Sequence, residues 1–281
     1  MLSYLPLSAS VQAKTPVQCS VVGDLELRPF TSAVFHNTRT LRVWLPQEYK
    51  RSENRDRHYP VLYLNDGQDL FDACTSVFNT EEWRVDETAT DLIREKRVVP
   101  LIIVGIDNAG KRDRPREYLP FPDETLRPLV TEVHGEDYPK FLVDEVMPFI
   151  NREYRTEVEA AKTGLGGSSY GAGIALYTVM VRPGRFGRLL LESPSLYAHA
   201  NFLLNEARDF KQWPELLYIG VGTVNEPVDD VHRLVSILRH HRVGDRRLFV
   251  AEVPGAGHNE NAWADRFPRA LEFLYGSRVA K

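Results

Sequence analysis

The sequence predicts an α/β fold built on a mainly parallel sheet that is covered by helices on both faces. Short apolar runs alternate along the chain with segments whose apolar residues recur at helical spacing. The run at 99–106 is continuous and rich in β-branched residues, which is typical of a parallel strand buried on both faces. Only short connections separate the first apolar runs, so we expect the sheet to begin with antiparallel strands.

The individual elements follow from the same patterns. We expect antiparallel strands at 25–30, 32–36 and 40–45, and further strands at 60–64, 99–106, 163–168, 188–191, 216–221 and 248–253. Helices are expected at 83–96, 137–154, 171–181, 229–241 and 261–275, with Pro148 kinking the second. Residues 108–136 form the largest irregular stretch. Because no repeat or linker divides the chain, we expect residues 1–281 to form a single domain with an irregular extension at 1–20.

Composition narrows the class of protein. Of 281 residues, 43% are hydrophobic and 26% are charged, an ordinary balance for a soluble globular protein. The net charge is −4 and no stretch concentrates Lys and Arg, so neither a nucleic acid nor a membrane surface is an expected partner. The apolar run at 98–106 is about half of a membrane span. We expect a soluble protein and slightly favour the cytoplasm over the periplasm or a secreted location. The sequence leaves the oligomeric state open.

The two cysteines and the N-terminus give weak signals. Cys19 and Cys74 lie far apart in the sequence and in no CxxC or Cys/His cluster, so we expect two free thiols and no zinc site. The stretch at 11–13 resembles a signal-peptidase site, but no basic region precedes it and Pro6 interrupts the apolar residues. We therefore interpret it as a mature terminus.

The segment Gly167-Ser168-Ser169-Tyr170-Gly171 matches G-x-S-x-G with Ser169 at its centre. It lies between a predicted strand and a helix of small residues, where a nucleophilic serine adopts strained backbone angles in a sharp turn. Glycines on both sides remove the Cβ atoms that would clash there. Ser169 is therefore the candidate nucleophile, and the N–H group of Tyr170 is a candidate oxyanion donor.

A serine hydroxyl needs a base, and in this arrangement an acid and then a histidine follow the serine. The histidines after Ser169 are His199, His232, His240, His241 and His258. We choose His258, which stands in a Gly-rich loop after the last strand, and interpret 232, 240 and 241 as surface residues. For the acid, Glu226 lies in the loop after the preceding strand, whereas Asp229 and Asp230 have the position of helix-start residues. Glu226 is preferred, and the other two stay open.

Further site residues are predicted from neighbouring loops. The turn Asn65-Asp66-Gly67-Gln68 follows an early strand, so the N–H group of Gln68 is the candidate second oxyanion donor. Arg116 and Tyr118 are candidate substrate contacts, although we favour the interpretation that Arg116 anchors a loop through a carboxylate. Tyr197 is a further candidate wall of the pocket, and Trp263 is expected to pack under the His258 loop.

Taken together, several segments resemble the esterase family that includes enterochelin-type siderophore esterases, S-formylglutathione hydrolases, feruloyl and acetyl-xylan esterases, and mycolyltransferases. The likeness covers roughly residues 30–275 and favours the enterochelin esterase-like members. Its segments are 61–71 (VLYLNDGQDLF), 83–87, 103–108, 116–118, 141–154, 167–171, 192–196, 257–258, Glu260 and Trp263. One departure is Ala172, where members often carry glycine.

The resemblance implies an α/β-hydrolase three-layer sandwich that hydrolyses carboxylic esters through Ser169, His258 and Glu226, with no metal and no cofactor. The expected substrate is a small-molecule or sugar-linked ester whose acyl and alcohol parts the sequence leaves open. Two alternatives remain. One is an acyltransferase that uses the same residues. The other, from a different class of protein, is a catalytically silent binding module on the same fold.

Overall fold

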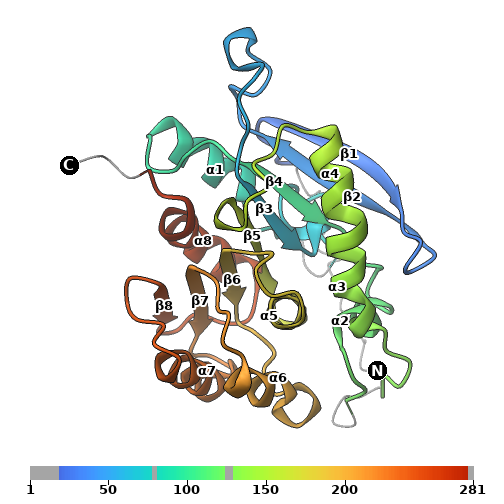
Figure 1. The fold of residues 1–281 in the computed structure, drawn as a ribbon, viewed down its shortest axis with the longest axis vertical. Coiled ribbons are helices and arrows are strands. Elements are labelled where there is room, and N and C mark those ends of the chain that lie inside the picture. The colour runs from blue at the N-terminus through green and yellow to red at the C-terminus, as the bar shows by residue number, and fades with distance from the viewer. Residues whose placement is uncertain (1–18, 78–80, 124–128, 278–281) are drawn as a thin grey trace, which may run out of the picture.

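The computed structural model describes residues 19–77, 81–123 and 129–277, and its centre is one sheet of eight strands (Figure 1). The strand order is β1-β2-β4-β3-β5-β6-β7-β8. β1 pairs antiparallel with β2 and β2 antiparallel with β4, whereas β3 to β8 are parallel. The strands are β1 Asp24–Thr31, β2 Thr38–Leu45, β3 Val61–Asn65, β4 Ile102–Ile106, β5 Thr163–Ser168, β6 Arg188–Glu192, β7 Leu216–Gly222 and β8 Leu248–Val253. The expected mainly parallel sheet with an antiparallel start is confirmed.

Helices cover both faces of this sheet (Figure 1). Residues of α1 and α8 share one hydrophobic core with one face, and α3 to α7 share a second core with the other. The helices are α1 Val85–Arg94, α2 Arg114–Tyr118, α3 Tyr138–Lys140, α4 Met147–Glu153, α5 Tyr170–Val181, α6 Ala198–Asp209, α7 Val228–His240 and α8 Glu260–Tyr275. Short 3₁₀ turns lie at Ser52–Asn54, Gly67–Asp69, Gly135–Asp137 and Ala160–Lys162. Among the described residues, no helix is long and apolar enough to cross a membrane.

Two local predictions differ from the structure. Residues 32–36 form a turn instead of a strand, because the carboxylate of Glu145 accepts hydrogen bonds from the Ser32 hydroxyl and from the N–H groups of Ala33 and Val34. The helix expected at 137–154 is present, but its middle, Phe141–Val146, is a π-helix. Pro148 follows directly after it, in the first turn of α4, where a proline costs the fewest helical hydrogen bonds.

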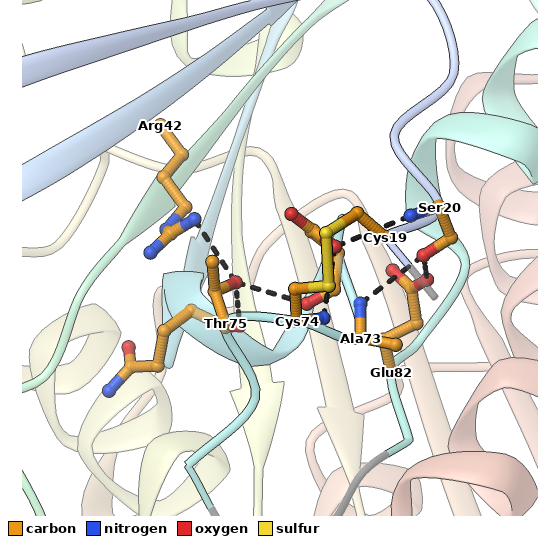
Figure 2. The surroundings of a disulfide bond; sticks show 9 residues. Cys19, Ser20, Arg42, Ala73, Cys74, Thr75 and Glu82 are labelled. Carbon is orange, nitrogen blue, oxygen red and sulfur yellow. Dashed lines mark hydrogen bonds between the residues drawn. A yellow bond between two sulfur atoms is a disulfide. The ribbon is translucent and has the colours of Figure 1, made fainter. Parts of the chain in front are cut away.

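The prediction of two free thiols is wrong, because Cys19 and Cys74 form a disulfide across 55 residues of sequence. Figure 2 shows the bond joining the segment of Cys19 and Ser20 to the turn at residues 73–75. The same turn supports the loop after β3, since the Thr75 hydroxyl donates to the carbonyl oxygen of Gln68 at 2.8 Å. Disulfides persist mainly in oxidising compartments, which does not favour the expected cytoplasmic location. Residues 1–18 of the expected extension lie outside the described residues.

Reduction of this disulfide is expected to lower the free energy of unfolding by about 2–4 kcal/mol, because the bond restricts the unfolded chain over a long loop. Urea unfolding with and without a reductant measures the change. The double variant Cys19→Ser/Cys74→Ser is the control: its stability should match that of the reduced protein and should not respond to reductant. Equal stability of the oxidised and reduced forms would contradict the prediction.

Candidate active site

The turn between β5 and α5 holds Ser169 in the strained conformation expected of a nucleophile. Its backbone angles are φ 55° and ψ −124°, a region that residues with a side chain rarely occupy. The neighbouring glycines permit the turn. A Cβ atom on Gly171 would lie 2.7 Å from Oδ2 of Asp66, and one on Gly167 would lie 2.8 Å from the carbonyl carbon of Gly171. The turn therefore requires glycine at both positions, and it presents Ser169 at the carboxyl edge of the sheet.

The structure brings His258 and Glu226 together from the loops after β8 and β7. Nδ1 of His258 lies 2.9 Å from Oε2 of Glu226, whose side chain is 0% exposed. Burial acts to raise the pKa of Glu226, but the hydrogen bonds from His258 and Ser193 outweigh it and hold that pKa below the ordinary value. The carboxylate is therefore charged at neutral pH. It fixes the imidazole so that Nε2 is left for another partner.

Ser169 and His258 line the same pocket, whose volume is ≈ 180 Å³. The hydroxyl of Ser169 also lies 3.3 Å from the hydroxyl of Ser195, a buried residue just after β6. The pocket is lined by Asp66, Asp69, Trp83, Arg114, Ser168, Ser169, His258, Glu260 and Trp263. It thus combines a serine, an imidazole, two indole rings and several charged groups.

The alternative acids do not reach His258 in this structure. Asp230 lies in the first turn of α7 and pairs with Arg233, one turn further along the same helix, at 2.9 Å. Asp229 is exposed in the same turn. Both occupy the helix-start positions that the sequence suggested for them. Only Glu226 of these candidates contacts the imidazole.

A buried polar layer lies behind Glu226, and sequence reasoning gave it no role. The Ser193 hydroxyl donates to Oε1 of Glu226 at 2.6 Å and accepts from the indole N–H of Trp263 at 3.0 Å. Arg266 pairs at 2.7 Å with Glu192, whose pKa burial raises to about 7 in spite of that cation. Ser193 thus restrains the acid from behind. The only sequence signal for it was the segment 192–196 in the family resemblance.

Trp263 has the position predicted for it. Its indole ring meets the imidazole of His258 edge to face, with ring centroids 5.2 Å apart. The expected surface positions of His232 and His240 are confirmed, whereas His241 is half-buried. His199, at the start of α6, accepts or donates a hydrogen bond with the carbonyl oxygen of Pro122 at 2.8 Å.

The opposite wall of the pocket contains an ion pair that the sequence did not reveal. Arg114 of α2 forms a two-pronged pair with Asp66, at 2.6 and 2.7 Å, and both side chains are about nine-tenths buried. Asn108 donates to the same carboxylate at 2.7 Å. Arg114 stands two residues before Arg116, which the sequence had singled out. This pair fixes the loop after β3 against α2.

Three predicted substrate contacts lie outside the pocket that contains Ser169. Arg116 pairs with Asp113 at 3.4 Å and Glu132 at 3.5 Å, as a loop anchor would, and lines a separate groove. Tyr118 is buried, and its hydroxyl accepts from the N–H of Asp66 at 3.3 Å. Tyr197 is 45% exposed. Their contact with a substrate stays a prediction.

The two candidate oxyanion donors lie after β5 and after β3. Tyr170 is the first residue of α5, so its N–H group stands at a helix N-terminus next to Ser169. Gln68 lies in the 3₁₀ turn Gly67–Asp69. Its Oε1 accepts from the N–H of Asn108 at 3.0 Å, and its carbonyl oxygen accepts from the Thr75 hydroxyl at 2.8 Å. Ala172, the departure from the family pattern, is fully buried in the core.

The carboxyl group of Asp69, in the same pocket, is buried, and this burial raises its pKa to about 7 from 3.8. The folded protein therefore holds this proton above the pH at which the unfolded chain loses it. Between pH 4 and about 7 ionisation favours the unfolded chain, so wild type should lose on the order of 3 kcal/mol of stability relative to Asp69→Asn. Chemical unfolding of both proteins at pH 4 and pH 8 measures the difference, and a constant gap would contradict the prediction.

The sheet order, the strained serine and the histidine at the carboxyl edge define the class as an α/β-hydrolase. The family model described as "Putative esterase" matches residues 32–274. The chain belongs to this family, and it is a carboxylic ester hydrolase.

Individual relatives agree with this class. The chain is 30% identical over 156 residues to a siderophore enterobactin esterase of Emericella nidulans, covering 53% of this chain and 50% of that one. It is 24% identical over 220 residues to the ferri-bacillibactin esterase BesA of Bacillus subtilis, covering 68% and 69%. The solved structure of the enterobactin esterase FES from Shigella flexneri superposes with a TM-score of 0.70 at 19% identity, covering 91% of this chain and 60% of that one. The chain thus spans half to about two thirds of these proteins.

Proposed function

We propose that the chain hydrolyses its ester by two-step acyl transfer at Ser169. His258 takes the hydroxyl proton while Oγ bonds to the ester carbonyl carbon, and the N–H groups of Tyr170 and Gln68 hold the oxyanion. The carbon–oxygen bond to the alcohol then breaks as His258 returns the proton to the leaving oxygen. Water, activated by the same imidazole, cleaves the acyl-enzyme and restores Ser169.

One observation carries this proposal: a strained serine shares its pocket with an imidazole whose other nitrogen is held by a buried carboxylate. The roles are divided by environment. Glu226 has a lowered pKa and stays charged, so it orients the imidazole and stabilises its cationic form. Ser169 lies at the helix N-terminus, where the local dipole favours the developing negative charge.

For the substrate, we propose a siderophore-type or feruloyl-type ester. Relatives and similar solved structures include an enterobactin esterase, a ferri-bacillibactin esterase and a ferulic acid esterase. Trp83 and Trp263 give the pocket two flat apolar walls that suit an aromatic ring. The carboxyl groups of Asp69 and Glu260 add hydrogen-bond acceptors for hydroxyl groups on such a ring.

Trapping of the acyl-enzyme tests the mechanism. The full chain is mixed with p-nitrophenyl esters from acetate to octanoate, with methyl ferulate or with enterobactin, quenched in acid, digested and analysed by mass spectrometry. We expect one acyl adduct on the peptide that contains Ser169. An adduct on another residue would overturn the assignment of the nucleophile. Hydrolysis with no adduct on rapid quenching would argue for direct attack by water.

The same experiment separates the alternatives. If an added alcohol or sugar collects most of the acyl group as a new ester, the protein is an acyltransferase that uses the same residues. If a folded protein forms neither adduct nor product with any of the esters, the silent binding module replaces the proposed mechanism.

A further inference from the structure

The disulfide between Cys19 and Cys74 lies at the surface, beside a loop that the proposed mechanism uses. Both cysteines are exposed, so a dissolved thiol has access to the bond. Residues 66–77 follow β3 and include both Cys74 and Gln68, the candidate oxyanion donor. The position of the disulfide therefore bears on the position of this donor.

The N-terminal side of the bond is anchored to regular structure. Residues 19–22 form a strap, and the N–H of Val22 donates to Oδ2 of Asp86 in α1 at 2.5 Å. The carbonyl oxygen of Val22 accepts from the indole N–H of Trp44 in β2 at 3.0 Å. The strap is thus fixed relative to the sheet and to α1, and the disulfide fixes the turn at residues 73–75 relative to the strap.

Hydrogen bonds join the strap and the turn beside the disulfide (Figure 2). Oδ1 of Asp72 accepts from the N–H of Ser20 at 3.3 Å and from the N–H of Cys74 at 3.0 Å. The N–H of Ala73 donates to the Ser20 hydroxyl at 3.2 Å. Hydrogen bonds near the surface open easily in exchange for bonds to water, so the covalent bond is the permanent link between the two segments.

Thr75, next to Cys74, connects this turn to the candidate oxyanion donor. Its hydroxyl lies 2.8 Å from the carbonyl oxygen of Gln68 and 3.0 Å from that of Asp72. Nη1 of Arg42 donates to the same hydroxyl at 3.2 Å, and Figure 2 shows the guanidinium directed toward it. Because the oxygen accepts from Arg42, its own proton points to the carbonyl oxygens. The hydroxyl is therefore a donor of fixed direction.

Two contacts then hold Gln68 in place. Its carbonyl oxygen accepts from Thr75, and its Oε1 accepts from the N–H of Asn108 at 3.0 Å. An oxyanion donor stabilises a transition state because its direction is set before the reaction, so that no reorientation is needed when the charge develops. The contact with Thr75 is one of the two that set this direction for the N–H of Gln68.

We propose that Thr75 is a positioning residue for the N–H group of Gln68, and that the Cys19–Cys74 disulfide keeps Thr75 in place. Two electrons and two protons from a dithiol convert the bond into two thiols, while the dithiol becomes its own disulfide. The strap then no longer holds the turn, and Gln68 loses support on the side of Thr75. Ester hydrolysis is therefore slower in a reducing environment. The inference rests on the proposed function, because it concerns the oxyanion site of Ser169.

The effect is expected on kcat. The N–H of Tyr170 belongs to α5 and keeps its direction, so one donor of the two is disturbed. Complete removal of an oxyanion donor lowers kcat by about 10²–10³-fold, and a donor that only loses part of its support should cost about threefold or more. KM should change little, because the oxyanion is absent from the bound ester and forms in both acylation and deacylation.

Steady-state hydrolysis of p-nitrophenyl acetate by the full chain, before and after treatment with dithiothreitol, tests the proposal. Titration should find two free thiols per chain after reduction, and circular dichroism should show that the fold persists. We expect kcat to fall by about threefold or more at nearly constant KM, and to recover on reoxidation. The control Cys19→Ser/Cys74→Ser should have the kcat of the reduced protein with or without dithiothreitol. Equal kcat of the oxidised and the reduced, folded protein would overturn the proposal, as would a change in KM alone.

Variants of Thr75 test the positioning contact itself. Thr75→Val keeps the shape of the side chain but loses the hydroxyl, and it should lower kcat by about tenfold. Thr75→Ser keeps the hydroxyl and should restore most of this loss. The matched control is Thr31→Val, which removes a hydroxyl that bonds that of Thr38 at 2.9 Å on the exposed edge of β1, and it should leave kcat unchanged. Wild-type kcat in Thr75→Val, or equal losses in Thr75→Val and Thr75→Ser, would reject the role of this hydroxyl.

A binding measurement separates this inference from the proposed mechanism. Phenylboronic acid bonds to a serine hydroxyl as a tetrahedral anion, and it should bind the oxidised protein about threefold or more tightly than the reduced one. An acyl adduct on Ser169 in both redox states, with equal kcat and equal boronate affinity, would overturn the inference alone. Absence of adduct and activity in both states would overturn the mechanism and the inference with it. If the reduced protein does not stay folded, the Thr75 variants decide, and if Thr75→Val does not fold, the oxidised and reduced wild type decide.

Discussion

Replacement of Ser169 by alanine is expected to lower kcat for ester hydrolysis by about 10⁴-fold or more, because no acyl-enzyme can then form. The strained backbone at this position accepts alanine as it accepts serine, so the fold should persist. Hydrolysis of the p-nitrophenyl ester series by wild type and Ser169→Ala measures the loss. A variant that keeps most of the activity would show that another group attacks the ester.

The matched control for this prediction is Ser195→Ala, which removes the hydroxyl 3.3 Å from that of Ser169. Ser195 is buried just after β6, and its hydroxyl contacts that of Ser169, whereas His258 is bonded to Glu226. We expect its removal to reduce kcat by less than about tenfold, the scale of one lost neutral hydrogen bond. A loss as large as that of Ser169→Ala would show that nucleophilic attack needs both hydroxyl groups.

Replacement of Glu226 by glutamine is expected to lower kcat by about 10³–10⁴-fold while KM changes little. The amide keeps the shape of the side chain but carries no charge to stabilise the cationic imidazole. Its NH₂ group can donate to Nδ1, which favours the tautomer of His258 that carries its proton on Nε2. Steady-state kinetics at a pH near 8, where Glu226 of the wild type is charged, measures the effect.

Asp230→Asn is the matched control, since it makes the same change at the acid that the sequence could not exclude. Its carboxylate pairs with Arg233 on α7, so only a small loss of helix stability is expected. If Asp230→Asn loses more activity than Glu226→Gln, the catalytic acid has been assigned to the wrong residue.

The features that local sequence patterns control were predictable. The turn at Ser169 needs glycines at fixed spacing, and the structure shows the close approaches that require them. Strand β8 has the predicted bounds because a nearly continuous apolar run specifies it, whereas β5, whose sequence is TGLGGS, was predicted from its place before the G-x-S-x-G turn. The choice of Glu226 over Asp230 was only a preference. The loop and the first helical turn lie side by side in sequence, and the hydrogen bond to His258 depends on tertiary structure.

The features that depend on contacts distant in sequence were missed. The disulfide joins residues 55 apart, and neither cysteine has a local motif. Arg114 meets Asp66 across 48 residues, and the sequence drew attention to Arg116 instead. The turn at residues 32–36 has apolar residues typical of a strand, but Glu145, more than one hundred residues away, captures its donors. In each case a contact with a residue distant in sequence decides the structure.

The reacting groups and the ion pair that lines the same pocket come from different parts of the fold. Ser169, Glu226 and His258 follow β5, β7 and β8, whereas Asp66 and Arg114 come from the other half of the sheet and from α2. A graft of the α2 region from a related enzyme would therefore change one wall of the pocket and leave the reacting groups in place. For such a chimera, Asp66 and Arg114 must be exchanged together, because either one alone leaves a buried charge without its partner.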